Sequence, residues 1–105
     1  MILKIFSVYD MKAKFVGQPF YEQQEESALR AFTDAVNDSS RAENMWNKHP
    51  ADFQLFVIGE FDNESGHVHP LGPNAIVMAS AVHRSFDSSQ LELFQKNGEK
   101  KVPVN

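Results

Sequence analysis

The stretch Phe53–Asp62, FQLFVIGEFD, is the most apolar and most strand-like part of this chain of 105 residues. Successive side chains of a strand point to opposite sides. One side is predicted to carry Phe53, Leu55, Val57 and Phe61, and the other Phe56 and Ile58. A strand that is apolar on both sides needs cover on both sides, so this stretch is predicted to lie at the centre of a sheet.

Further strands are predicted before and after this stretch. Residues 2–10, ILKIFSVYD, are rich in β-branched and aromatic residues. Residues 15–22 are predicted to be extended, either as an edge strand or irregular, because Pro19 has no N–H donor. Residues 62–66 predict a hairpin loop, after which residues 67–71 are expected to pair back as a short edge strand.

One principal helix is predicted at residues 25–37. Its apolar residues recur at helical spacing and are Ala28, Leu29, Phe32, Ala35 and Val36. Residues 75–82, AIVMASAV, are compatible with a strand or a helix and slightly favour a helix. The pattern predicts a small α+β domain over residues 1–84, in which one principal helix packs on an antiparallel sheet of three to five strands. Residues 85–105 are expected to form a loosely ordered C-terminal tail.

Composition narrows the function classes. The chain has no cysteine, which excludes disulfides and thiolate chemistry. It shows neither a signal peptide nor an apolar run long enough to cross a membrane, so a soluble, cytoplasmic protein is expected. The net charge is −4, and residues 22–65 carry ten acids against three basic residues. Because nucleic-acid binding usually needs a basic face, only the N-terminal segment and the tail could supply one.

Nothing in the sequence predicts an enzyme or a cofactor. There is no P-loop, no G-x-G-x-x-G and no G-x-S-x-G motif. The acids of residues 25–38 are better explained by a solvated helix face than by acid–base catalysis. His67 and His69 have the spacing of two metal ligands on one strand, with Glu60 as a third, but two exposed polar residues on an edge strand are favoured.

The N-terminal part carries the best candidate for nucleic-acid binding. Single-stranded DNA is held by cations along its backbone and by aromatic rings that stack on its bases. The candidate DNA-binding residues are Lys4, Phe6, Tyr9, Lys12, Lys14, Phe15 and Tyr21. In the alternative interpretation Phe6, Phe15 and Phe20 belong to the core and the lysines only solubilise the protein. The residues alone favour that alternative.

Protein–protein contacts have their own candidates. Trp46 stands in a polar segment, where it is equally compatible with an interface anchor and with a lid on the local core. The expected tail contains Leu91 and Phe94, which could dock on a partner.

Four blocks of sequence resemble a known family when they are taken together. They are residues 5–13 (IFSVYDMKA), 19–20 (PF), 28–38 (ALRAFTDAVND) and 49–62 (HPADFQLFVIGEFD). Their order and spacing resemble the small nonstructural protein of gokushoviruses, single-stranded DNA bacteriophages within the microviruses. The resemblance covers about residues 2–66, roughly two-thirds of the chain.

The resemblance implies a non-enzymatic protein of the bacterial host cytoplasm that binds single-stranded DNA during genome synthesis or packaging. It supplies no catalytic or ligand-binding residue. A homodimer is expected, because two copies would place two basic segments along one strand. The alternative is an interaction module without DNA contact, which binds a phage replication or capsid-assembly protein or a host factor through Trp46 or the tail.

Overall fold

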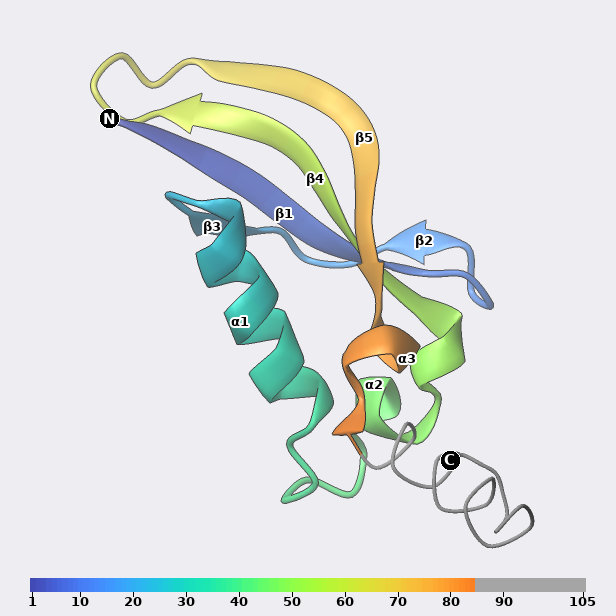
Figure 1. The fold of residues 1–105 in the computed structure, drawn as a ribbon. Helices are drawn as coiled ribbons and strands as arrows, with labels where there is room; N and C mark the ends of the chain where they lie inside the picture. Colours follow the sequence, from blue (N-terminus) through green and yellow to red (C-terminus); the bar gives the residue numbers. More distant parts are fainter. Residues whose placement is uncertain (85–105) are drawn as a thin grey trace, which may run out of the picture.

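The computed structural model describes residues 1–84, and its sheet is built around β4 (Phe53–Asp62). β4 pairs antiparallel with β1 (Ile2–Asp10) on one edge and with β5 (Val68–Met78) on the other. The second edge of β1 is shared by two short strands, β2 (Phe15–Val16) and β3 (Phe20–Glu22). The central position predicted for Phe53–Asp62 is therefore confirmed (Figure 1).

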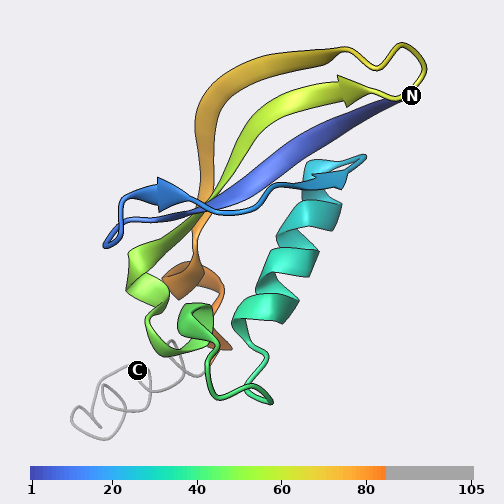
Figure 2. The same cartoon turned by 180° about the vertical axis from the view of Figure 1, so that it is seen from behind.

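The helices lie along one face of the sheet and at one end of it. The principal helix, α1 (Glu25–Val36), runs along one face, while α2 (Met45–Lys48), the 3₁₀ turn η1 (Pro50–Asp52) and α3 (Ala79–Val82) gather beyond one end (Figures 1 and 2). The predicted fold, a small α+β domain with one principal helix on an antiparallel sheet, is confirmed, and the sheet has five strands within residues 1–84. None of the described helices is long and apolar enough to cross a membrane.

The core lies between α1 and the sheet. Helical spacing places the buried residues of α1 on one stripe, and the strands contribute the opposing layer. The buried apolar side chains that form this core cluster are Phe6, Val8, Ala28, Phe32, Val36, Phe53, Leu55 and Ala79. Burying one large apolar side chain contributes about 1.5–3 kcal/mol. These residues therefore hold the helix against the sheet.

Asparagine side chains close the C-terminal end of α1, where backbone carbonyls lack helical partners. The Nδ2 group of Asn44 donates to the carbonyl oxygens of Ala35 (2.9 Å) and Asp38 (2.8 Å). Asn47 Nδ2 donates to the carbonyl oxygen of Val36 at 3.0 Å. Asn44 is only 5% exposed, so these bonds are made inside the protein. They fasten α2 to the end of α1.

β4 contains one extra residue where it pairs with β1. The register steps from Ile5 opposite Gly59 to Phe6 opposite Val57, which leaves Ile58 without a partner on β1. Such a bulge bends a strand and shifts the side-chain alternation beyond it. The sheet is visibly curved over α1 (Figure 1).

The bulge overturns part of the predicted side-chain pattern. Phe56 lies opposite Ser7, and Phe61 lies opposite Leu3. Ser7 and Leu3 share one side of β1 because they are four residues apart. Phe61 therefore shares a side with Phe56, and the prediction that placed it with Phe53 is wrong.

Residues 75–82 are mostly strand, and the slight preference for a helix is wrong for the first half. β5 continues to Met78, which lies opposite Gln54, and only Ala79–Val82 is helical. Backbone pairing along the long strand β4 outweighs the helix propensity of an alanine-containing segment. The predicted short strand at residues 67–71 is likewise only the start of β5, which accommodates Pro70 because its outer edge is unpaired within the described residues.

Although β4 is apolar on both sides, elements of the described part of the chain cover only one face of the sheet. No element of residues 1–84 lies over the face away from α1, which we call the open face. The strand register places on it Leu3, Ile5, Ser7, Tyr9, Val16, Tyr21, Gln54, Phe56, Phe61, Val68, Pro70, Ala75 and Met78.

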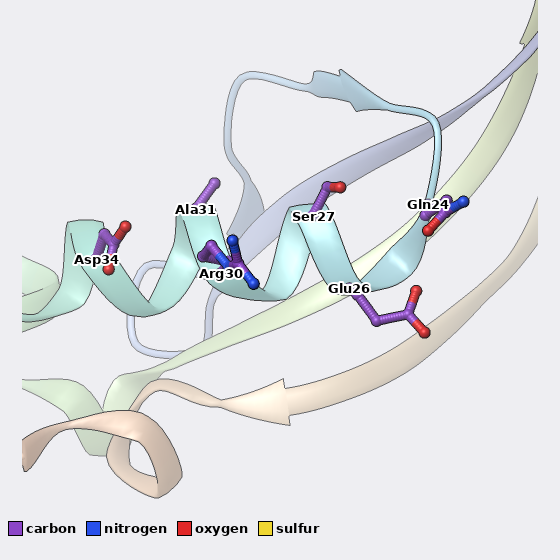
Figure 3. Close-up of a pocket in the computed structure, with 6 residues that line it drawn as sticks. All are labelled: Gln24, Glu26, Ser27, Arg30, Ala31 and Asp34. Carbon is purple, nitrogen blue, oxygen red and sulfur yellow. The ribbon is translucent and has the colours of Figure 1, made fainter.

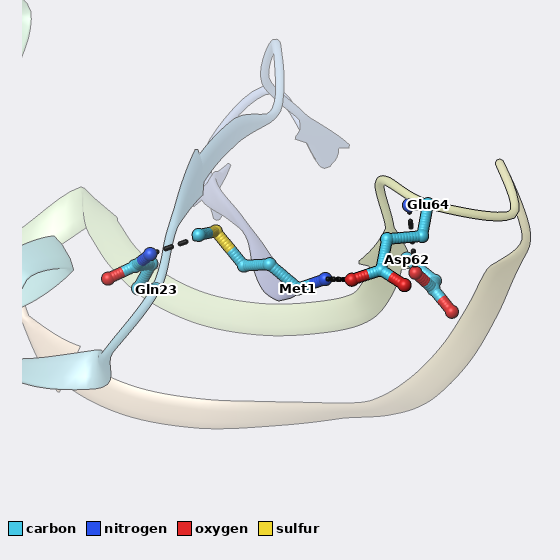
Figure 4. Close-up of polar contacts among 4 residues, drawn as sticks. All are labelled: Met1, Gln23, Asp62 and Glu64. Carbon is cyan, nitrogen blue, oxygen red and sulfur yellow. Dashed lines mark hydrogen bonds and ion pairs between the residues drawn. The ribbon is translucent and has the colours of Figure 1, made fainter.

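Polar contacts close the end of the sheet at the β4–β5 turn. The ammonium group of Met1 forms an ion pair with Glu64 Oε2 at 3.0 Å, and Gln23 Nε2 lies 2.8 Å from Met1 Sδ (Figure 4). Asp62 accepts a hydrogen bond from the backbone N–H of Glu64 at 2.9 Å. The acidic groups of this turn are thus occupied by local partners.

Candidate nucleic-acid interface

Two aromatic pairs stand on the open face. The rings of Tyr9 and Phe56 meet edge to face with centroids 6.2 Å apart, and those of Tyr21 and Phe61 meet in the same manner at 5.9 Å. Tyr21 is 51% exposed, so its ring is accessible to a ligand. Edge-to-face packing holds aromatic rings in a fixed orientation. The predicted residues Tyr9 and Tyr21 therefore stand on the same face of the sheet.

Lys12 and Lys14 lie in the exposed turn between β1 and β2. Asp10 Oδ1 accepts the backbone N–H groups of Lys12 and Ala13, each at 3.0 Å, and Asp10 O accepts the N–H of Lys14 at 2.7 Å. Lys14 has a φ of 61°, a conformation that a tight turn requires. The turn is thus fixed by its own hydrogen bonds, which leaves both lysine side chains in solvent beside the strand that carries Tyr9.

Phe6 does not belong to the candidate interface. It is fully buried, and its ring stacks on Phe20 with centroids 5.7 Å apart. A ring enclosed by the core cannot stack on a base, so the assignment of Phe6 to DNA binding is corrected to a core role. The structure therefore supports the alternative interpretation of the sequence, in which Phe6 belongs to the core.

Lys4 and Phe15 lie on the other side of the sheet. Lys4 is directly opposite Glu22 on β3 and Glu60 on β4, and cross-strand partners share a side. Phe15 is 56% exposed but lies opposite Asp10, on the side away from Val16. The structure therefore brings Tyr9 and Tyr21 onto one face, with Lys12 and Lys14 in the turn at the Tyr9 end of β1, and places Lys4, Phe6 and Phe15 on the other side.

Sequence reasoning missed Phe56 and Phe61 as members of this surface. Strict alternation assigned them to opposite sides, and only the bulge at Ile58 unites them. One signal was present, since a glycine inside a strand pattern often marks a bulge, and Gly59 follows Ile58 directly. The number of aromatic rings on the open face therefore depends on a single inserted residue.

A small apolar hollow opens on the same face. Its volume is about 210 Å³, and it is lined by Ser7, Tyr9, Val16, Phe56, Ile58 and Pro73. Ser7 is fully buried, and its hydroxyl donates to the carbonyl oxygen of Gly17 at 2.7 Å. No unsatisfied polar group of Ser7 therefore faces the hollow.

Acidic side chains gather on the opposite side of the molecule. A hollow of about 450 Å³ lies on the outer flank of α1 and is lined by Gln24, Glu26, Ser27, Arg30, Ala31 and Asp34 (Figure 3). Its charged groups stand apart along an exposed helix, without the burial or close pairing that tunes catalytic carboxyls. This flank is a solvated helix face, as the sequence favoured.

Within residues 1–84, two carboxyl groups have a lowered pKa, and both belong to turns. Hydrogen bonds from the hydroxyl and the backbone N–H of Ser40 lower the pKa of Asp38. A hydrogen bond from the backbone N–H of Glu64 lowers the pKa of Asp62. Both shifts result from local turn hydrogen bonds and do not indicate a catalytic site.

His67 and His69 lie side by side with ring centroids 6.1 Å apart, and Glu60 is directly opposite His69. Within residues 1–84, however, no three His, Cys, Asp or Glu side chains come together in a way that could hold a metal ion.

Trp46 packs as a lid on the core. Its ring lies between those of Phe32 and Phe53, with centroid distances of 5.4 and 6.4 Å. This packing favours the lid over the interface anchor. The other predicted partner-binding residues, Leu91 and Phe94, lie outside the described residues.

Comparison with known proteins adds evidence of relationship. Residues 3–82 match the model of a family described as Phage ORF5 protein. The protein ORF5 of Chlamydia phage 1 is 33% identical over 85 residues, which are 79% of this chain and 88% of that protein. No solved structure matches the chain significantly.

Proposed function

Because this chain belongs to the Phage ORF5 protein family, as its resemblance to a gokushovirus nonstructural protein predicted, we propose that it binds single-stranded DNA through the open face of its sheet. Binding takes place in the host cytoplasm during phage genome synthesis or packaging. The protein contributes no chemistry to that process and acts by holding the strand.

The observation that carries this proposal is the composition of the open face. The Tyr9–Phe56 and Tyr21–Phe61 pairs offer ring surfaces on which bases can stack. None of the strand positions that the register places on this face is acidic. A phosphate backbone can therefore cross it without meeting a like charge.

The two lysines of the β1–β2 turn provide the electrostatic part of binding. Lys12 and Lys14 project from the end of the strand that carries Tyr9, where they can neutralise phosphates of a strand lying on the open face. The acidic residues of α1 are on the covered side of the sheet. The negative net charge of the chain thus does not oppose DNA at this surface.

Salt-dependent binding of a labelled single-stranded oligonucleotide, measured by fluorescence anisotropy, tests the proposal. Lys12→Glu combined with Lys14→Glu is expected to weaken binding and to reduce the slope of log affinity against log salt by about 0.7 for each phosphate that the variant no longer neutralises. Lys48→Glu, an exposed lysine on α2, is the matched control and should leave affinity nearly unchanged. If the wild-type protein forms no complex at low salt, the proposal fails.

We also propose that the protein acts as a homodimer, in which two open faces bind one strand and raise each other's effective concentration. Sedimentation velocity with and without oligonucleotide measures this directly. A single monomeric species at all concentrations, in both conditions, would remove the dimer from the proposal.

A second candidate function is an interaction module that binds a phage replication or capsid-assembly protein or a host factor without DNA contact. It is favoured by an apolar groove of about 210 Å³ on the helix side, lined by Phe20, Ala31, Phe32, Ala35 and Trp46. Ala31→Glu places a charge in this groove at an exposed helix position, and Arg30→Glu next to it is the control. Recovery of the phage protein in a pull-down should fall with the first variant only.

A further inference from the structure

The apolar hollow of the open face is small. At about 210 Å³ it is smaller than the roughly 300–1,000 Å³ of sites that enclose whole small molecules. It lies where the sheet is bent by the bulge, and the bulged residue Ile58 forms part of its lining. The edge-to-face pair Tyr9–Phe56 lines it as well.

The lining offers no hydrogen bond to the edge of a base. The hydroxyl group of Ser7 already donates its hydrogen bond to the carbonyl oxygen of Gly17. The rest of the exposed lining consists of carbon atoms of Tyr9, Val16, Phe56, Ile58 and Pro73. A polar group that enters such a site loses water without replacement, so only an apolar edge of a base can enter it without penalty while the polar edges stay in solvent. Thymine is distinguished by its C5-methyl group, which makes apolar contacts in protein complexes.

We propose that this hollow receives a thymine base of the bound single strand, with its methyl group against the apolar lining. The inference rests on the proposed function and adds a base preference to it. The preference for thymine arises from contact with its methyl group and not from hydrogen bonds to the base. The protein therefore binds thymine more tightly at this position without excluding other bases, and other positions of the strand can carry any base.

Oligo(dT) and oligo(dU) of equal length provide the sharpest test, because they differ only in the C5-methyl groups and carry the same charge. Wild-type protein is expected to bind oligo(dT) more tightly, by about tenfold or less, since one methylene in an enclosed pocket is worth at least about tenfold and this hollow is open on one side. Val16→Trp, at a position 53% exposed, fills the hollow and should abolish the difference. Val68→Trp, at a similarly exposed position of the open face outside the hollow, is the control that should preserve it.

Each outcome decides a separate point. Equal affinity of the wild type for the two oligonucleotides overturns the thymine assignment and leaves DNA binding intact. A dT preference that survives Val16→Trp also overturns it, because the methyl contact then lies elsewhere. Absence of binding to both oligonucleotides at low salt overturns the proposed function itself. If sedimentation shows a dimer that Val16→Trp dissociates, the hollow belongs to a second copy of the chain and the assignment is wrong.

Discussion

The ring of Tyr9 meets the ring of Phe56 edge to face, with centroids 6.2 Å apart and planes at 88°. The two residues are diagonal neighbours on adjacent strands, since Tyr9 is opposite Gln54 and Phe56 is opposite Ser7. Both stand on the open face, while the next residues along the strands, Val8 and Leu55, are buried under α1. The same two strands therefore build the core on one side and an aromatic surface on the other.

Truncating Tyr21 should weaken DNA binding without unfolding the protein. Tyr21→Ala removes a ring that is 51% exposed and meets the ring of Phe61 edge to face. Loss of one stacked base costs about 1–3 kcal/mol, so affinity for an oligonucleotide should fall by roughly fivefold to a hundredfold or more. Met45→Ala, an equally exposed apolar residue on α2, is the control. Unchanged affinity of the Tyr21 variant would show that its ring does not contact DNA.

Adding a methyl group at Gly59 should destabilise the bulge. A Cβ there would lie 2.9 Å from the carbonyl oxygen of His69 and 3.3 Å from Ile5 Cδ1, closer than packed atoms normally approach. Gly59→Ala is therefore expected to lower the free energy of unfolding by about 1–3 kcal/mol, as overpacking does. Urea denaturation monitors the change. Gly66→Ala, where the added Cβ meets no atom within 4 Å but φ is +81°, separates steric clash from backbone strain.

Removing the amide of Asn44 should loosen the end of α1. Asn44→Ala removes a buried amide and deletes its two hydrogen bonds to the carbonyls of Ala35 and Asp38, so that the carbonyl of Ala35 keeps only the longer bond from the backbone N–H of Asp38 at 3.3 Å. The expected loss is about 1–3 kcal/mol of unfolding free energy. The melting temperature of the Asn44 variant measures this loss, and Ser39→Ala, at an exposed position in the adjacent turn, is the control. Equal melting temperatures would mean that solvent satisfies these carbonyls equally well.

Acid should remove the small contribution that two carboxyl groups in turns make to the stability of the folded protein. The pKa values of Asp38 and Asp62 are lowered from 3.8 in the folded protein by hydrogen bonds from Ser40 and Glu64 respectively. A lowered folded pKa gives stability that is fully present above the unfolded value and is lost as pH falls through the folded value. The double variant Asp38→Asn with Asp62→Asn should therefore have a lower urea midpoint than wild type at neutral pH. In strong acid the two midpoints should become equal. Urea midpoints measured across the acid range test this, and a pH-independent difference would contradict it.

Most of the architecture was predictable from local patterns. The length and apolarity of Phe53–Asp62 were sufficient to predict a central strand, and the stripe through Ala28, Phe32 and Val36 was sufficient to predict the helix. Both predictions depend on the spacing of apolar residues within one short segment, which can be read directly from the sequence. Residues 75–82 lacked such a pattern, and their pairing with β4 decided their conformation.

The candidate site was predictable only in part. Tyr9 and Tyr21 lie on the same face of the sheet, and Lys12 and Lys14 lie in the turn that follows Tyr9, while their role in DNA binding stays a prediction. Phe6 was grouped with them although it belongs to the core, because an aromatic residue in a strand has the same appearance on either face. The expected contacts of Leu91 and Phe94 lie outside the described residues.

The sequence by itself determined the fold class, the central strand, the principal helix and the family, because each depends on a pattern carried by consecutive residues. Only the tertiary structure decided which aromatic rings share a face. Phe56 and Phe61 come together because β1 pairs with β4 in a register that leaves Ile58 unpaired. That register is set by contacts between strands far apart in the chain, and one unpaired residue reverses the direction of every side chain beyond it.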